Sequence, residues 1–91
     1  MAEVTRNADA SRFEVWVDGV RAGELDYVVD GDTWVLPHTG VDKAYEGQGL
    51  AGQLVRTALD TARAEGVRIK PVCPYVVAWL QRHPDYQDLV A

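Results

Sequence analysis

The first half of the chain alternates apolar and polar side chains with the period of β-strands. Apolar residues occupy every second position of the first such segment: Phe13, Val15 and Val17. This period indicates a sheet with one buried face. The dipeptides Asp18-Gly19 and Asp30-Gly31 separate successive segments, and Asp-Gly favours tight hairpin turns because both residues tolerate positive φ. We therefore expect an antiparallel meander, preceded by a short strand near Val4.

The later strands of this meander differ in regularity. The second carries Leu25, Tyr27 and Val29 on its apolar side, and a third extended segment runs from about residue 33 to residue 41. Pro37 interrupts that third segment, and because proline cannot donate a ladder hydrogen bond it marks an edge, a bulge or a strand end. Gly40 adds a second weak point. The pattern predicts one long, distorted strand or two short strands in series.

The apolar period changes to that of a helix between Leu50 and Glu65. Apolar residues there share one stripe: Ala51, Leu54, Val55, Ala58 and Ala62. This stripe predicts an amphipathic helix of about four turns, with Gly66 as its C-terminal stop. A short strand at residues 67–72 follows. Strand, helix and strand in this order indicate a crossover that lays the last strand parallel to an earlier one.

A final helix is expected at residues 75–83. Its apolar face consists of residues at helical spacing: Val76, Trp79, Leu80 and His83. Pro74 suits the first turn, where a missing N–H costs nothing, and Pro84 ends the helix. The fold class is therefore α+β, an antiparallel meander followed by a helix crossover to a parallel strand and a C-terminal helix. We expect one domain spanning residues 1–91.

Composition narrows the classes of function. The 9 basic residues form no cluster and are outnumbered by 14 acidic ones, so no stripe of charge is available to neutralise nucleic-acid phosphates. Cys73 is the sole cysteine, which excludes an intrachain disulfide and a cysteine zinc site, and we expect no metal. The first residues lack the apolar core of a signal peptide and no run approaches a membrane span. We expect a cytoplasmic protein without membrane or nucleic-acid partners.

The most informative stretch is the glycine loop, residues 46–52, which joins the distorted strand to the first helix. The first N–H groups of a helix have no partner within it and carry the positive end of its dipole. An anion placed there collects several backbone hydrogen bonds at once. Glycine or alanine at positions 47, 49, 51 and 52 keeps side chains from blocking its approach. A tight turn with close helix–sheet packing would use the same glycines.

The loop resembles the pyrophosphate-binding loop of the GNAT acetyltransferases, Arg/Gln-x-x-Gly-x-Gly/Ala. The match holds at Gly49 and Ala51, and Glu46 stands where Arg or Gln is usual. The spacing fits neither the dinucleotide fingerprint nor the nucleoside-triphosphate loop. The resemblance implies that acetyl-coenzyme A (acetyl-CoA) is the cofactor. The residues it assigns to cofactor binding are Thr39, Val41, Glu46, Gly47, Gln48, Gly49, Leu50, Ala51 and Gly52.

The likeness extends to a subgroup of short, single-domain GNAT proteins that lack the helices between the first strands. Three further segments carry it: His38-Thr39-x-Val41, Val72-Cys73-Pro74-Tyr75-Val76, and His83-Pro84-x-Tyr86-x-x-Leu89-Val90. In GNAT proteins the fourth and fifth strands splay apart and the pantetheine arm lies between them. The resemblance therefore implies a GNAT-like fold in which freed backbone groups near Thr39 and Val41 bond the pantetheine amides.

The implied chemistry is direct attack of an amine, on a small molecule or a protein, on the acetyl thioester. Tyr75 resembles the tyrosine that often protonates the leaving thiolate, although it could equally pack at the helix start. Cys73, at a helix N-terminus, could act as acid or carry the acyl group, or be a small buried hydrophobe. His38 is a candidate base or substrate contact, or a structural residue. The short subgroup tends to carry glutamate at the position of Gly40, so a carboxylate is missing here.

Two other functions compete with N-acetyl transfer. Glu46 and Gly40 favour a non-catalytic acyl-CoA-binding or interaction module that kept the loop and lost base chemistry. A third interpretation is a small binding domain whose glycine turn is purely architectural. The chain has few loops to form an acceptor cleft, so self-association or a partner is expected to complete the site.

Overall fold

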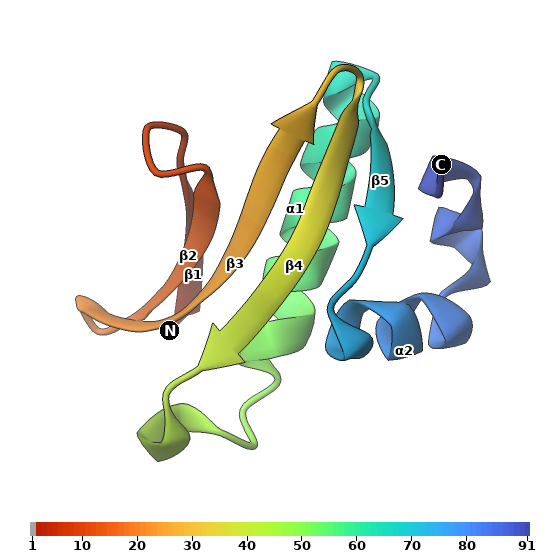
Figure 1. The fold of residues 1–91 in the computed structure, drawn as a ribbon. Coiled ribbons are helices and arrows are strands. Elements are labelled where there is room, and N and C mark those ends of the chain that lie inside the picture. Colours follow the sequence, from red (N-terminus) through yellow and green to blue (C-terminus); the bar gives the residue numbers. More distant parts are fainter. Residues whose placement is uncertain (1) are drawn as a thin grey trace.

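The computed structural model describes residues 2–91 and contains one five-stranded sheet. The elements in chain order are β1 (Ala2–Asn7), β2 (Arg12–Val17), β3 (Val20–Asp30), β4 (Thr33–Val41), η1 (Lys43–Tyr45), α1 (Leu50–Glu65), β5 (Arg68–Pro71), α2 (Pro74–Arg82) and η2 (Pro84–Leu89). Strands β1 to β4 are antiparallel neighbours, and β5 lies parallel to β4 at the edge. Figure 1 shows α1 across one face of the sheet and α2 beyond the end of β5.

Local sequence signals explain most of these elements. Asp18 and Gly19 both have positive φ, 50° and 82°, as the hairpin turn between β2 and β3 requires. Helix α1 has the predicted bounds, and Gly66 ends it in the left-handed conformation at φ 72°. The predicted α+β fold, with a meander, a crossover helix, a parallel strand and a C-terminal helix, is confirmed.

The core lies between α1 and the sheet. Fully buried side chains from the sheet and the helix meet there: Phe13, Leu25, Leu36, Leu54, Leu59 and Ile69. Val29 was expected on the buried side of β3, but it is 59% exposed. The pairing of β2 with β3 ends at Arg12 and Asp26, so the last residues of β3 project past that neighbour and lose its cover.

Strand β4 changes character along its length. The register between β3 and β4 shifts between Asp26 and Val28, which places one extra residue of β4 beside Pro37, as the proline predicts. Gly40 pairs regularly with Glu24, so the expected second weak point there is wrong. Strand β5 pairs with β4 only along Thr33–Leu36. The remainder of β4 therefore has no strand neighbour on that side, and the expected splaying of the two strands is present.

The C-terminal segment adds an element that the sequence did not predict. Beyond α2 the chain forms the 3₁₀ helix η2, which Tyr86 ties to α1 by donating a hydrogen bond of 2.6 Å to Asp60. His83, expected on the apolar face of α2, is half-buried and stacks on Trp79 with ring centroids 3.7 Å apart. Across residues 2–91, no helix combines the length and apolar character that crossing a bilayer would demand.

Candidate functional site

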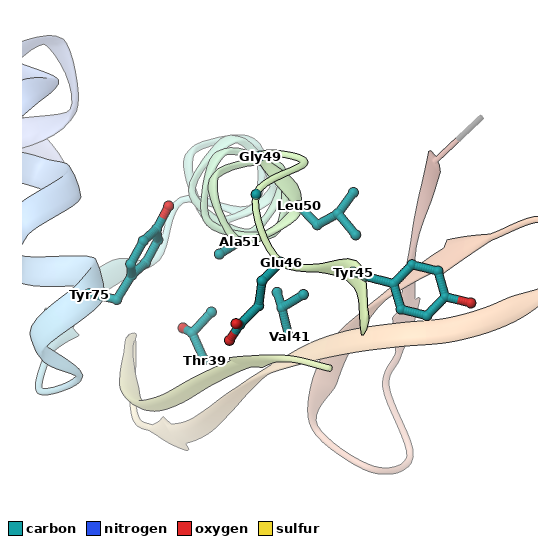
Figure 2. Close-up of a pocket in the computed structure, with 9 residues that line it drawn as sticks. Thr39, Val41, Tyr45, Glu46, Gly49, Leu50, Ala51 and Tyr75 are labelled. Carbon is teal, nitrogen blue, oxygen red and sulfur yellow. The ribbon is translucent and has the colours of Figure 1, made fainter. Parts of the chain in front are cut away.

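A cavity of about 320 Å³ opens between the start of α1 and the unpaired end of β4. Its walls come from β4, the connecting segment with η1, the glycine loop and α2 (Figure 2). The lining residues are Thr39, Val41, Tyr45, Glu46, Gly47, Gly49, Leu50, Ala51 and Tyr75. The strand end that lost its neighbour and the helix start with unpaired amides thus face the same space.

The glycine loop presents unpaired main-chain amides to this cavity. Among the described residues, the amide nitrogens of residues 47–52 have no hydrogen-bond partner, and the first bond of the helix runs from Gln53 N–H to the Gly49 carbonyl at 3.2 Å. Gly47 and Gly49 have φ of 85° and 74°, and a Cβ on either would meet no atom within 4 Å. The loop is therefore open on its outer side and can accept an anion at the positive end of α1.

Most residues assigned to cofactor binding line the cavity, and two do not. Gln48 is exposed outside the lining. Gly52 faces α2, where a Cβ would lie 3.6 Å from the Tyr75 hydroxyl and 3.7 Å from Trp79 Nε1. Both distances are ordinary van der Waals contacts, so the packing of α2 on the first turn of α1 does not itself require glycine here. The main-chain amide of Gly52 is nevertheless one of the unpaired amides of residues 47–52.

The cavity lacks the positively charged side chains that would favour a diphosphate, and it includes one carboxylate. The lining contains no lysine or arginine. The side chain of Glu46 points from the loop toward β4, beside Thr39 and Val41 (Figure 2), and no ion pair to its carboxylate occurs within residues 2–91. The lining therefore offers an anion backbone amides and hydroxyl groups, and no cationic side chain.

Thr39 carries an unsatisfied polar atom at the base of the cavity. Its hydroxyl oxygen is buried and makes no hydrogen bond of ordinary geometry, a rare and costly condition for a buried polar group. The same hydroxyl lies close enough to Cys73 to favour the thiolate. Thr39 is thus available to a polar group that enters from the cavity.

Cys73 caps α2 and is buried behind the cavity lining, with 7% of its surface exposed. Burial raises the pKa of its thiol, but hydrogen bonds from the backbone N–H groups of Val76 and Tyr75, with the nearby Thr39, outweigh it. The pKa of Cys73 is therefore lowered. This is the helix N-terminal setting that the sequence predicts.

Tyr75 reaches the cavity from the first turn of α2. Its side chain points toward the start of α1 (Figure 2), and 36% of the residue is exposed. A phenolic hydroxyl at this place can donate a proton or a hydrogen bond to a group held between β4 and α1.

His38 lies on the other face of β4, because alternate strand residues point to opposite sides. It is solvent-exposed, and its Nε2 lies 3.0 Å from Oε2 of Glu24 on β3. Glu24 was not predicted from the sequence, since only the β3–β4 register brings it beside His38. Tyr45 in the cavity wall was not predicted either, although an aromatic residue directly before the glycine loop is a usable signal.

Comparison with known proteins gives a family match over most of the chain. A family model described as GCN5-related N-acetyl-transferase matches residues 12–89. Among curated proteins, the chain is similar to Protein NATD1 of Bos taurus, at 37% identity over 49 residues. That match covers 54% of this chain and 43% of the relative, so it spans less than half of the relative's length.

Solved structures share the fold at low identity. A GCN5-like protein from Staphylococcus aureus aligns with a TM-score of 0.75 and 24% identity, over 98% of this chain and 87% of its own. The ribosomal-protein-S18-alanine N-acetyltransferase of Escherichia coli aligns at 0.69 and 22%, covering 79% of this chain and 50% of that one. N-acetylglutamate synthase from Neisseria gonorrhoeae, complexed with coenzyme A and N-acetyl-glutamate, aligns at 0.67 and 15%, over 87% and 21%.

Proposed function

Because the chain belongs to the GCN5-related N-acetyltransferase family, we propose that it transfers an acetyl group from acetyl-CoA to an amine. The observation that carries the proposal is the run of unpaired amides at residues 47–52 beside a cavity that ends at the unpaired half of β4. Its amine acceptor is a small molecule or a protein. We also propose that the protein works in the cytoplasm.

In this proposal the glycine loop binds the diphosphate. Each hydrogen bond from an amide to a charged oxygen contributes roughly 1.5–3 kcal/mol, so three or more would supply much of the free energy of a micromolar complex. Leu50 and Ala51, in the first turn of α1, offer their amides beside Gly47 and Gly49. Glu46 opposes binding by its charge.

The pantetheine arm would follow β4 toward the gap beside β5. Thr39 and Val41 line that side of the cavity, and the unsatisfied Thr39 hydroxyl is suited to an amide of the arm. The residues present therefore fit the elongated cosubstrate, which supplies an activated acetyl thioester. The arm would place that thioester where β4 and β5 no longer pair.

Two groups of α2 are candidates to protonate the departing thiolate. Tyr75 is exposed to the cavity, whereas Cys73 is buried behind Thr39. We assign the acid to Tyr75 because it lines the cavity directly. Cys73 is the alternative candidate, as an acid or as a transient carrier of the acyl group, and its lowered pKa supports this role.

The acceptor side would be completed from outside the described chain. Helices α1 and α2 both pack on the side of the sheet that carries the core, and the opposite face bears charged residues of β2 and β3 and His38 of β4. A second copy of the chain or the acceptor protein itself would cover this face.

Calorimetric titration with acetyl-CoA tests cosubstrate binding without any knowledge of the acceptor. A sharp variant is Ala51→Asp, because a carboxylate in the first turn favours helix α1 yet repels a diphosphate. We expect an unchanged or higher unfolding midpoint together with loss of binding. Ala51→Asn is the matched neutral control and should retain most of the affinity. Equal affinity in the Asp variant would contradict the proposed placement.

Turnover distinguishes the enzyme from the binding module that Glu46 favours. Acetyl-CoA is incubated with a panel of amines, and release of free thiol is followed together with acetylation of each amine. Transfer that falls sharply in Tyr75→Phe supports the enzyme. Binding without transfer to any amine supports the acyl-CoA-binding module, and absence of binding supports a purely architectural glycine loop.

A further inference from the structure

The face of β4 that points away from the cavity holds an ion pair in an unusual place. His38 Nε2 and Glu24 Oε2 are 3.0 Å apart. A Cβ built on Gly40 would lie 2.8 Å from the same Glu24 oxygen and 2.9 Å from the same His38 nitrogen. The pair therefore occupies the volume that a side chain at residue 40 would fill.

The register of the sheet produces this arrangement. Glu24 pairs with Gly40 and Asp26 with His38, so Glu24 is the diagonal neighbour of His38 on one face of two antiparallel strands. Side chains at diagonal positions meet when both are long. Glycine at position 40 removes the group that would stand between them.

This pair borders the gap where the thioester would lie. Pairing of β4 with β5 ends at Leu36, and His38 is the second residue beyond that point. Thr39 and Val41 line the cavity from the α1 side, while His38 and Gly40 lie on the other face of the strand. A group held in the gap is therefore accessible to the cavity from one face and to His38 from the other.

We propose that His38 accepts the proton of the attacking ammonium and that Glu24 is the positioning carboxylate of this base, an assignment that rests on the proposed function. An ionised carboxylate can only accept hydrogen bonds, so His38 Nε2 carries the shared proton and Nδ1 has the free lone pair. No described residue hydrogen-bonds to His38 Nδ1. Glu24 on β3 thus places a carboxylate in the volume that a side chain at residue 40 would fill.

The proton inventory balances with groups already named. The ammonium gives one proton to His38 Nδ1, and its nitrogen then forms a bond to the acetyl carbon as the carbon–sulfur bond breaks. The thiolate takes a proton from the acid on α2, and the second proton that the nitrogen loses as it becomes an amide restores that acid. Glu24 stabilises the imidazolium that forms, as a carboxylate does for a catalytic histidine.

The choice of acceptor makes a direct test. An alkylamine is charged at neutral pH and needs a base, whereas hydroxylamine is largely uncharged and does not. We expect Glu24→Gln to lower kcat for the alkylamine by about tenfold or more, to leave KM for acetyl-CoA unchanged and to change the rate with hydroxylamine less than about twofold. Asp30→Asn neutralises an exposed charge at the far end of the same strand, opposite Thr33, so it is the matched control and should resemble the unaltered chain.

Relocating the carboxylate completes the test. The double variant Glu24→Ala/Gly40→Glu removes the clashing Glu24 oxygen and returns a carboxylate from β4. The tip of the exposed His38 side chain has to shift away from the new Cβ, and the variant should then recover most of the alkylamine rate lost in Glu24→Ala. Equal losses with both acceptors, or no loss at all, would overturn the assignment while leaving acetyl transfer intact. If the unaltered chain acetylates neither acceptor, the proposed function fails with it.

Discussion

The two halves of β4 differ in almost every physical respect although they form one strand. Residues Thr33–Leu36 are flanked by β3 and by β5, and Trp34 and Leu36 are buried in the core. Residues 37–41 begin at the bulge, pair in regular register with β3 from His38 onward and have β3 as their only strand neighbour, and they include the buried, unpaired hydroxyl of Thr39. The backbone groups of the first half can pair with strands on both sides. The second half has no strand partner on the β5 side, so its groups there are available to a ligand.

This difference indicates how one strand can serve both stability and binding. Irregular backbone and unsatisfied polar groups cost stability, and they persist where the rest of the fold compensates for them. Here the regular half and α1 anchor the strand, so the open half can keep groups available for a ligand. Substitutions in the two halves should therefore affect different measurements.

The largest expected effect is on stability, from Leu36→Ala in the regular half. Leu36 is fully buried, and truncating such a side chain costs about 2–5 kcal/mol. The backbone carbonyl that accepts hydrogen bonds from the N–H groups of Val72 and Cys73 is kept in this variant, so the loss reports the buried side chain alone. Urea unfolding measures the loss.

The matched substitution in the open half is Thr39→Val, which keeps the shape and removes the hydroxyl. Because that hydroxyl makes no hydrogen bond of ordinary geometry, the free energy of unfolding should stay the same or rise slightly. Acetyl-CoA affinity measured by calorimetry should fall by about fivefold, the value of one hydrogen bond. A destabilised Thr39→Val protein would show that the two halves of β4 do not differ as described.

The next prediction compares alanine substitutions at two glycines near the start of α1, which should change stability in opposite directions. Gly49→Ala places a side chain at φ 74° and should cost about 1–2 kcal/mol, with a parallel loss of acetyl-CoA affinity as the loop shifts. Gly52→Ala should instead stabilise the protein by up to about 1 kcal/mol, because the new Cβ meets Tyr75 and Trp79 only at ordinary contact distance. Thermal unfolding and titration of both variants measure the contrast, and changes of the same sign would contradict it.

A smaller effect is expected from the charge in the cavity. Glu46→Gln removes a carboxylate that points toward β4 and should tighten acetyl-CoA binding about two- to fivefold, the range of an exposed charge interaction. The gain should shrink at high salt because the site is open to solvent. Asp30→Asn, exposed at the β3–β4 turn, is the control and should leave the affinity unchanged. An equal gain in the control would assign the effect to net charge.

The sequence predicted those parts of the fold that depend on local patterns. The bounds of α1 follow from its apolar stripe and from Gly66, and the bulge in β4 follows from Pro37. Each of these signals acts within a few residues of the chain. The same is true of the glycine loop, whose residues line the cavity largely as predicted.

Features that depend on pairing between distant segments were missed or misread. Gly40 was taken for a weak point in the strand, whereas the pair formed by Glu24 and His38 fills the space at its α-carbon. Recognising this needs the register of β3 against β4, which a bulge shifts by one residue. The solvent exposure of Val29 likewise depends on where β2 begins.

The smallest predicted effect concerns Cys73, which lies where the two halves of β4 meet, since its N–H bonds to the Leu36 carbonyl. Its pKa is lowered in the folded protein, so between the folded value and the ordinary value of about 8.5 the unfolded chain binds more protons. The free energy of unfolding should therefore rise with pH through this window, reach its full contribution above the unfolded value and be lost as pH falls through the folded value. Tyr86, whose pKa is raised from 10.0, titrates outside the window. Urea unfolding at pH 7 and pH 9.5 measures the rise, which Cys73→Ser should abolish; a rise of equal size in that variant would assign it to another group.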